Sequence, residues 1–313
     1  MTFISRHSGS TMGNLHDIPS QAGEPVSPRR RALLAAGANV ALSALLYGCS
    51  APGSADAAAL AQGVVWQLDE DHVNPHGDWN RLGVTDLLVQ WTAVDDISFL
   101  PGTTMQTTQR LPDWTRIGGE PWARNVIVGL AGRFDETTAR AQAAQLVEQS
   151  KQLAAVRPAV HIDGYYFPVE VDPTWKDAVT LAPLLDKLPR PLWISVYDNS
   201  NIGGRALAAW LDGWLPKDVG VFLQDGCGVY ARGPAAAREY ADALAARLGK
   251  DRVRIIAEAF RPAQNGAFRA ATAAELSPQL LAYRGYRTYL FDGPHYVSDQ
   301  LVQDLQGMQQ AQK

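Results

Sequence analysis

Two glutamates close apolar runs that are typical of buried strands. Glu170 ends the run 164–170, and Glu258 ends the run 253–258. Paired carboxylates carry out glycoside hydrolysis, in which one protonates the departing oxygen while the other attacks the sugar carbon or activates water. Apolar neighbours raise the pKa of a carboxyl that no cation offsets, which suits a proton donor. A single glutamate at a strand end commonly pairs with an arginine or caps a helix, so the prediction depends on the two together.

A third carboxylate, Asp225, ends the run 219–225 and precedes Gly226-Cys227-Gly228. Glycines let the backbone approach a ligand closely or adopt a positive φ. Asp225 could orient one of the glutamates, bind a sugar hydroxyl or replace one of them as the catalyst, and the structural alternative is an Asx turn that closes a tight loop. Cys227 has no histidine near it in the sequence, so we interpret it as a packing residue. The predicted catalytic set is Glu170, Glu258 and Asp225.

Aromatic and polar residues crowd the same strand ends. Sugar rings stack their C–H faces on aromatic side chains, and their hydroxyls bind carboxylates, amides and arginine. Because alternate strand residues face the barrel interior or the helices, about half of these positions are expected to be core. The predicted sugar contacts are Trp66, Gln67, Asp69, Gln90, Trp91, Tyr166, Tyr197, Asp198, Gln224, Tyr230, Phe260, Arg261 and Asp292.

Metal ligation has weaker support in the sequence. The segments 69–72 and 161–163 contain ligand types but lack the paired-histidine spacing of zinc sites and the calcium-loop pattern. His295, beside Asp292, is a candidate rim contact, although a lone histidine is more often structural. The chain also has no Gly-rich phosphate loop and no Gly-x-Ser-x-Gly elbow. We therefore predict no metal and no cofactor.

The strand-like runs number eight, which is the strand count of a closed parallel barrel. They span residues 64–69, 86–91, 125–130, 164–170, 191–197, 219–225, 253–258 and 288–292. Helical periodicity occupies 135–156, 174–188, 204–215, 234–248, 273–283 and 298–309, whereas the loops after the first two strands are long and helix-poor. A barrel gathers the carboxyl ends of its strands on one rim, so scattered polar residues converge.

These alternating patterns predict an α/β protein, a single-domain (β/α)8 TIM barrel. An open doubly wound sheet shares the alternation, but a Rossmann sheet requires a Gly-rich turn after its first strand. The segment 69–75 is not such a turn.

The N-terminal segment has the character of an export signal. Arginines 29–31 precede an apolar stretch at 32–46, which is shorter than the roughly twenty residues of a membrane span. The segment resembles a bacterial lipoprotein signal that ends at Cys49, and Arg30-Arg31 resembles the twin-arginine pattern, so the export route stays open. A cleaved secretory peptide or an uncleaved anchor is the alternative. We predict a signal over 1–49 with Cys49 lipidated, a tether over 50–62 and the barrel over 63–313, in a periplasmic or outer-membrane-anchored bacterial lipoprotein.

Charge and cysteine content limit which molecules the protein is expected to bind and which disulfides it can form. The net charge is −4 with no basic stripe, which excludes nucleic acid as an expected partner. Once Cys49 carries a lipid, only Cys227 remains, so no intramolecular disulfide can form. We expect a monomer that binds a polysaccharide and contacts the membrane only through its N-terminal lipid anchor.

Two resemblances rest on these motifs. The positions of Glu170 and Glu258 are similar to those in the clan of retaining barrel glycosidases, which implies that Glu170 is the acid/base and Glu258 the nucleophile. That clan usually has Asn before the acid/base, where this chain has Val169. The chain more closely resembles an uncharacterised family of bacterial barrel proteins classed as glycoside hydrolases. Its Gly-Tyr-Tyr-x-Pro-x-Glu and Gln-Asp-Gly-x-Gly motifs occur here at 164–170 and 224–228.

The sequence therefore favours a glycoside hydrolase that cleaves a bacterial exopolysaccharide at the cell envelope by a retaining two-carboxylate mechanism. A non-catalytic glycan-binding barrel lipoprotein of an exopolysaccharide synthesis or export system is the alternative, because barrels keep their shape after losing catalysts. A metal-dependent polysaccharide deacetylase is disfavoured because the sequence shows no suitable set of ligands.

Overall fold

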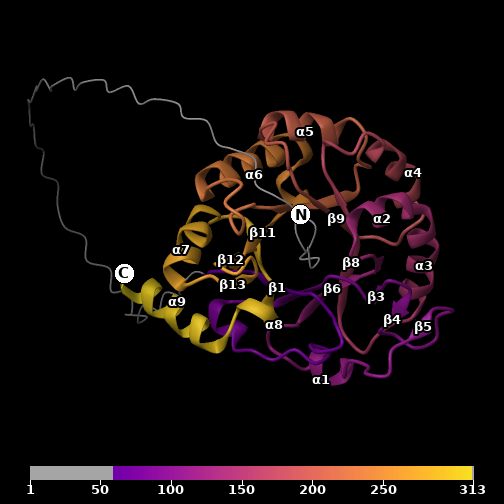
Figure 1. The fold of residues 1–313 in the computed structure, drawn as a ribbon, viewed down its shortest axis with the longest axis horizontal. Helices are drawn as coiled ribbons and strands as arrows, with labels where there is room; N and C mark the ends of the chain where they lie inside the picture. The colour runs from indigo at the N-terminus through magenta and orange to yellow at the C-terminus, as the bar shows by residue number, and fades with distance from the viewer. Residues whose placement is uncertain (1–58, 312–313) are drawn as a thin grey trace, which may run out of the picture. The chain divides into compact units, whose positions relative to one another are not determined.

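Eight parallel strands close into a barrel in the computed structural model, which describes residues 59–311 (Figure 1). Each predicted strand run overlaps one barrel strand, and the last strand pairs with the first. The predicted (β/α)8 fold is confirmed. In chain order the strands are β1 (Gly63–Trp66), β2 (Asp86–Val89), β6 (Asn125–Gly129), β8 (Ile162–Val171), β9 (Leu192–Val196), β10 (Val219–Gln224), β11 (Val253–Glu258) and β14 (Arg287–Phe291).

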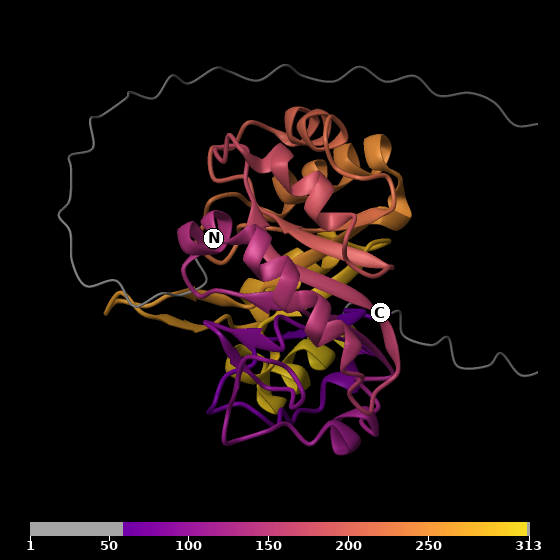
Figure 2. The same cartoon turned by 90° about the vertical axis from the view of Figure 1, so that its right-hand side faces the viewer.

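Helices surround the barrel on its outer side (Figure 2). The prediction 234–248 matches one helix at both ends, whereas the helix predicted over 135–156 is interrupted at Gln142. The helix predicted over 174–188 is reduced to two short pieces, because Pro183 has no N–H to continue a helix through it. The α-helices are α1 (Trp114–Gly118), α2 (Glu136–Ala141), α3 (Ala143–Ala155), α4 (Ala182–Leu185), α5 (Gly204–Asp212), α6 (Pro234–Leu248), α7 (Ala273–Ala282), α8 (Gly293–Tyr296) and α9 (Asp299–Ala311), and the 3-10 helices are η1 (Trp79–Leu82), η2 (Ala178–Leu181) and η3 (Lys250–Arg252).

Short strands extend the architecture beyond the barrel and were not predicted. A small sheet follows the order β5 (Gln106–Thr107), β4 (Ile97–Ser98), β3 (Ala93–Val94) and β7 (Ala131–Gly132). A hairpin of β12 (Phe260–Pro262) and β13 (Phe268–Ala270) follows β11 directly and projects from the barrel (Figure 2). Strands of two or three residues carry too little periodicity to be read from a sequence.

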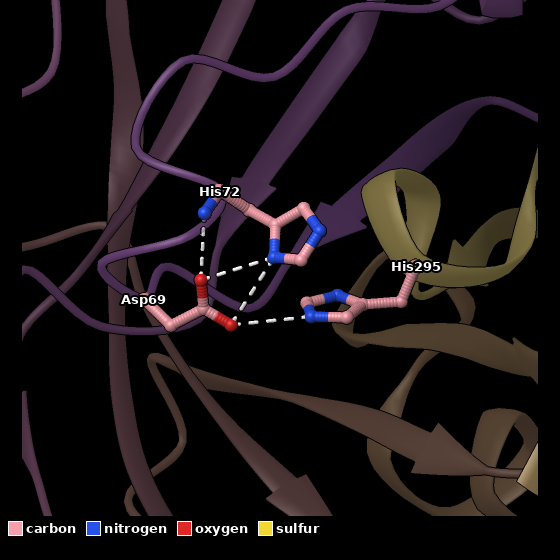
Figure 3. Close-up of side chains that lie close together, drawn as sticks. All are labelled: Asp69, His72 and His295. Carbon is pink, nitrogen blue, oxygen red and sulfur yellow. Dashed lines mark hydrogen bonds and ion pairs between the residues drawn. The ribbon is translucent and has the colours of Figure 1, made fainter.

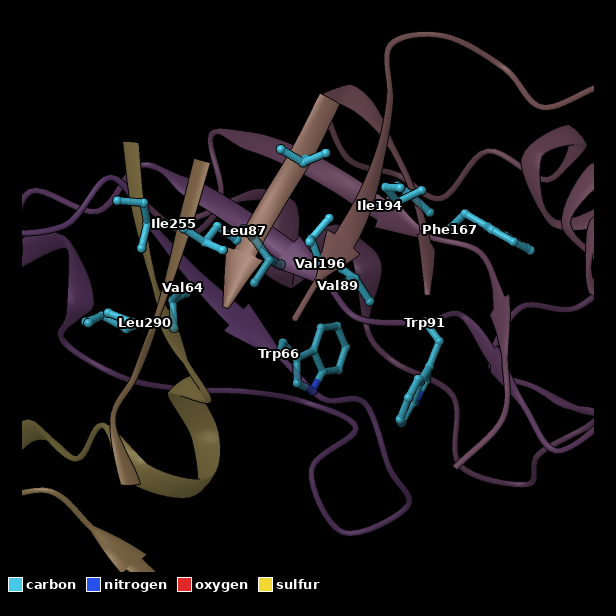
Figure 4. Packing of buried hydrophobic residues seen from close by; sticks show 14 of the residues in the cluster. Val64, Trp66, Leu87, Val89, Trp91, Phe167, Ile194, Val196, Ile255 and Leu290 are labelled. Carbon is cyan, nitrogen blue, oxygen red and sulfur yellow. The ribbon is translucent and has the colours of Figure 1, made fainter. Parts of the chain in front are cut away.

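Strand alternation separates an inner packing layer from an outer one. The inner layer consists of Val65, Leu88, Ile127, Tyr166, Trp193, Phe222, Ile256, Tyr289 and Phe291, together with Phe260 from β12. Its large rings lie over glycines: a Cβ on Gly220 would come 2.3 Å from Trp193. The intervening residues, such as Trp66, Val89 and Ile194, belong to a second cluster that includes residues of the helices (Figure 4). The position of a residue along its strand therefore decides whether it faces the interior.

The predicted signal, Cys49 and most of the tether lie outside the described residues, and the domain boundaries stay predictions. Within residues 59–311, no helix has both the length and the apolar character needed to cross a bilayer.

Candidate active site

The two glutamates lie at strand ends on one rim of the barrel. Glu258 is two residues beyond the inward-facing Ile256, so it shares that orientation. Glu170 lies within a register irregularity of β8 against β9. Both side chains are buried. Gln224 at the end of β10 donates from Nε2 to Oε2 of Glu170 at 2.5 Å. The structure thus joins two predicted site residues, Glu170 and Gln224, directly.

Asp225 faces away from the barrel interior, because it follows the inward-facing Gln224. Its Oδ1 accepts the backbone N–H groups of Cys227 at 3.0 Å and of Glu258 at 3.3 Å. Its Oδ2 accepts from Gln279 Nε2 at 2.6 Å and from the Tyr283 hydroxyl at 2.9 Å. Four donors saturate a carboxylate, so this placement suits the orienting role among the three predicted alternatives.

Gln279 and Tyr283 were missed by the sequence reasoning. They lie four residues apart at the end of α7 and so share one helix face. A buried glutamine on an otherwise apolar helix face is the signal that could have found them, because buried polar groups have partners.

Glu258 is held by the loop that Asp225 shapes. The N–H of Gly228 donates to Glu258 Oε2 at 2.6 Å. Burial raises the pKa of Glu258, the negative charge of Asp225 raises it further, and the Gly228 hydrogen bond offsets part of the shift, which leaves the pKa at about 8. Burial also raises the pKa of Asp225, against the hydrogen bonds that favour its charged form. Because Asp225 has four donors, we place the proton of the pair on Glu258.

Three inward-facing amide or carboxyl oxygens at strand ends have no hydrogen-bond partner within residues 59–311. They are Oε1 of Gln90, Oε1 of Gln224 and Oε1 of Glu258, at the ends of β2, β10 and β11. A buried polar atom left unpaired costs about 1 to 3 kcal/mol, and native structures contain few of them. Three on one rim indicate a place where a ligand rich in hydroxyl groups would supply the missing donors.

Two of the predicted sugar-stacking residues face the outer layer. Trp66 and Trp91 are 0 % and 1 % exposed. Their indole N–H groups donate to the carbonyls of His72 and Leu68, both at 2.7 Å. Because these rings follow inward-facing Val65 and Gln90, alternation turns them toward the outer layer, where they hold the loop after β1. We therefore do not assign them to sugar binding.

The remaining aromatic candidates differ in how accessible they are. Tyr166 and Phe260 are buried in the inner packing layer. Tyr197 lies under the guanidinium of Arg232, 5.2 Å from the ring centroid. Burial and the charge of Glu258 raise its pKa to about 12. Tyr230 is 65 % exposed and lines a pocket of about 240 Å³ beside Cys227, so it is the candidate with an open ring.

Arg261 and Asp198 form hydrogen bonds within the protein just beyond the ends of β11 and β9. The buried Arg261 donates to the carbonyls of Glu258 and Phe260 and to Gln279. Asp198 Oδ2 accepts from the Tyr240 hydroxyl at 2.7 Å.

Arg232, which the sequence reasoning did not select, donates to the carbonyls of Asp198, Gln224 and Asp225. It therefore ties together the loops after β9 and β10.

The last group of predicted contacts belongs to a chain of hydrogen bonds between the segments that follow β1 and β14, of which Figure 3 shows Asp69, His72 and His295. Asp69 Oδ2 lies 3.1 Å from His295 Nε2, and Asp292 Oδ2 lies 2.8 Å from His295 Nδ1. The N–H of Gln67 donates to Asp292 Oδ2 at 3.0 Å. On the other side, Asp69 Oδ1 lies 3.0 Å from His72 Nδ1. Local spacing could not reveal this cluster, because His295 is 226 residues from Asp69.

The carboxylates of this cluster shift the pKa of the imidazole between them. Burial lowers the pKa of His295, but its hydrogen bonds to Asp292 and Asp69 outweigh burial and raise the pKa to about 10. Burial raises the pKa of Asp69, and its hydrogen bonds to His295 and His72 more than compensate, which lowers it to about 2. Burial dominates at Asp292 and raises its pKa.

Comparison with known proteins supports the fold. No family model matches this sequence, so the resemblance to a named family is not confirmed. No curated protein matches it significantly either. Among solved structures, the chain is similar to one described as a putative alpha-L-fucosidase from Bacteroides thetaiotaomicron. The likeness has a TM-score of 0.53 at 15 % identity and covers 88 % of this chain and 97 % of the other. At this identity the likeness extends to the fold.

Proposed function

We propose that this protein is a glycoside hydrolase whose two acting carboxyls are Glu170 and Glu258. The observation that carries the proposal is the set of unpaired inward-facing oxygens of Gln90, Gln224 and Glu258, which lie on the rim that also bears Glu170. Hydroxyl groups of a sugar are the donors that such a set lacks. The similar solved barrel carries the name of a glycoside hydrolase, which agrees with this chemistry.

The contacts favour different roles for the two carboxyls, one as the proton donor and the other as the nucleophile. Glu258, with a pKa of about 8, holds a proton at neutral pH and is suited to protonate the departing oxygen. Glu170 accepts a hydrogen bond from the Gln224 amide, which orients its carboxyl and suits attack on the sugar carbon. This assignment reverses the one implied by the resemblance to the retaining clan.

Asp225 completes the proposed site as a positioning residue. It holds the backbone N–H of Glu258 and shapes the turn that brings Gly228 to the Glu258 carboxyl. Its negative charge also keeps the proton on Glu258. Tyr230, in its pocket beside this turn, would stack a more distant sugar of the chain.

We further propose a bacterial exopolysaccharide as the substrate and retention as the stereochemical course. An enzyme tethered through Cys49 would meet such polymers as they cross the cell envelope. Retention requires two carboxyls about 5 Å apart, whereas inversion requires roughly 6.5 to 9.5 Å. The hydrogen bond of Gln224 with Glu170 brings the end of β8 to the end of β10, which is the neighbour of the strand that bears Glu258.

Incubation of the full chain with a panel of bacterial exopolysaccharides tests the proposal. We expect new reducing ends from at least one polymer, and proton NMR of the first product should show the same anomer as the substrate linkage. Release with the opposite anomer would contradict the retaining course but not the proposed hydrolysis. Binding of a polymer without release would favour the non-catalytic glycan-binding alternative, and neither binding nor release would refute the proposed function.

The pH dependence of hydrolysis should report the proton on Glu258. We expect kcat/KM to fall above about pH 8, because a donor with that pKa loses its proton there. A pH series of initial rates on the hydrolysed polymer measures this fall, which is the alkaline limb of the rate profile. A rate that is unchanged up to pH 10, or that rises through pH 8, would remove Glu258 from the role of proton donor.

The raised pKa of Glu258 also determines how the free energy of unfolding changes with pH. The folded pKa of Glu258 lies above its ordinary value of 4.5, so its contribution is complete below about pH 4.5 and is lost as the pH rises through 8. Glu258→Gln should therefore flatten the decline of the unfolding free energy across this window. Glu136 is an internal reference, because burial also raises its pKa to about 8 and its contribution remains in both proteins.

A further inference from the structure

Asp69, His72 and His295 present one ligand atom each to a common point (Figure 3). These three atoms lie within 4.8 Å of one another. Nδ1 of His72 and Nε2 of His295 both face the Asp69 carboxylate, and the two imidazole rings lie 4.0 Å apart between centroids. A metal ion needs such convergence of side chains from separate parts of a chain, here the loop after β1 and helix α8.

A fully buried carboxylate fixes the orientation of His295. Asp292 is 0 % exposed, and its Oδ2 engages His295 Nδ1 at 2.8 Å, which leaves Nε2 directed at Asp69. The N–H of Gln67 holds Asp292 in turn. Metal-binding histidines characteristically have their second nitrogen on a carboxylate in this way, which sets the tautomer and the ring direction. Asp292 does not belong to the three ligands, so it is an independent sign of a built site.

The cluster is accessible from solution. The side chains of Asp69, His72 and His295 are 30 %, 37 % and 27 % exposed. A cavity of about 230 Å³ opens beside Asp69 and is lined further by Val94, Phe99 and Phe134, among others. Asp69 therefore contacts both histidines and also borders an open cavity.

We propose that Asp69, His72 and His295 form a site for a divalent first-row transition metal ion of the zinc class. Two imidazoles and one carboxylate are the donors that Zn²⁺ accepts, whereas Ca²⁺ and Mg²⁺ prefer oxygen ligands. Three protein ligands leave at least one position of a tetrahedral ion open. That position would take water or an oxygen of a bound sugar. This inference goes beyond the proposed hydrolase function and does not depend on it.

The local spacing of ligand types in the sequence gives no sign of this site. His72 lies three residues from Asp69, but its partner histidine lies in α8, which follows the last barrel strand. The hydrogen bonds of the cluster also offer a purely structural explanation, in which the carboxylates and imidazoles only join β1 to α8. Metal binding by the full chain distinguishes the two.

Equilibrium dialysis of the full chain against ZnCl2, followed by metal analysis, provides the test. We expect about one Zn²⁺ per chain. Co²⁺ in place of Zn²⁺ should give visible absorption bands typical of a four- or five-coordinate ion with nitrogen ligands. His295→Gln and His72→Gln should each weaken binding by at least about a hundredfold, and Asp292→Asn by about ten- to a hundredfold. His161→Gln is the matched control, because His161 is an exposed histidine at the start of β8 and should bind normally.

Thermal unfolding of each variant separates loss of the site from loss of the fold. His72→Gln is the variant expected to stay folded. Its ring lies partly exposed, and its only side-chain hydrogen-bond partner within residues 59–311 is Asp69. Failure of the unmutated chain to bind either ion would overturn the proposal. Stoichiometric binding that survives the combined His72→Gln and His295→Gln changes would overturn it too. Neither readout involves hydrolysis, so the result is independent of the proposed function.

Discussion

Glu258→Gln is expected to lower kcat/KM for polysaccharide hydrolysis by at least about a thousandfold while the protein stays folded. The amide cannot donate a proton to a departing oxygen, but its oxygen can still accept the N–H of Gly228. Because Glu258 is buried and holds its proton at neutral pH, glutamine is close to it in both charge and shape. Initial rates and a thermal unfolding curve for the same sample measure both parts of this expectation.

Glu170→Gln should cause a comparable loss for a different reason, because it removes the charged group proposed to attack the sugar. The leaving group separates the two roles. An aryl glycoside with a strongly acidic phenol needs no proton donor in the first step, so Glu258→Gln should recover most of its kcat/KM on that substrate whereas Glu170→Gln should not. Recovery by Glu170→Gln instead would restore the assignment implied by the retaining clan.

Glu148→Gln is a suitable control for both variants, because Glu148 is an exposed carboxyl on α3, on the outside of the barrel. It should hydrolyse the polymer at the unmutated rate. If either rim variant also keeps more than a tenth of that rate, the corresponding glutamate does not carry the reaction.

The barrel was predictable because each strand can be recognised from its own local sequence. Apolar runs bounded by turns, with helical periodicity between them, specify a parallel barrel without knowledge of any contact. Alternation then sorts part of the rim: Gln90, Gln224 and Glu258 share the inward parity of Leu88, Phe222 and Ile256. The same rule turns Trp66 and Trp91 outward, so a stricter use of it would have removed both tryptophans from the predicted sugar contacts.

The rest of the candidate site depends on contacts between distant segments. Asp225 meets Gln279 and Tyr283 only because α7 packs behind β10 and β11. His295 meets Asp69 only because β14 closes on β1. Neither spacing nor propensity encodes such pairs when one sequence is read alone. The orientation of Glu170 likewise depends on the register irregularity between β8 and β9, which strand alternation does not reveal.

Asp225→Asn is expected to lower the free energy of unfolding by about 3 to 5 kcal/mol, because it breaks a fully buried and saturated network. An asparagine keeps one acceptor, but its NH2 group would face the donors that now reach Oδ2. Gln279 cannot rotate to help, since its Oε1 already accepts from Arg261 Nη2. Chemical denaturation of the variant and the unmutated chain measures the difference. Tyr283→Phe, which removes one donor and keeps the ring, should cost less, about 2 kcal/mol.

A second readout tests whether Asp225 acts on Glu258 in addition to supporting the fold. The negative charge of Asp225 raises the pKa of Glu258, so its removal should shift the alkaline limb of the rate profile to lower pH. Tyr283→Phe keeps that charge and should leave the limb near pH 8 even though it also destabilises the protein. An Asp225→Asn variant that loses stability but keeps the alkaline limb would mean that the proton on Glu258 is held by burial alone.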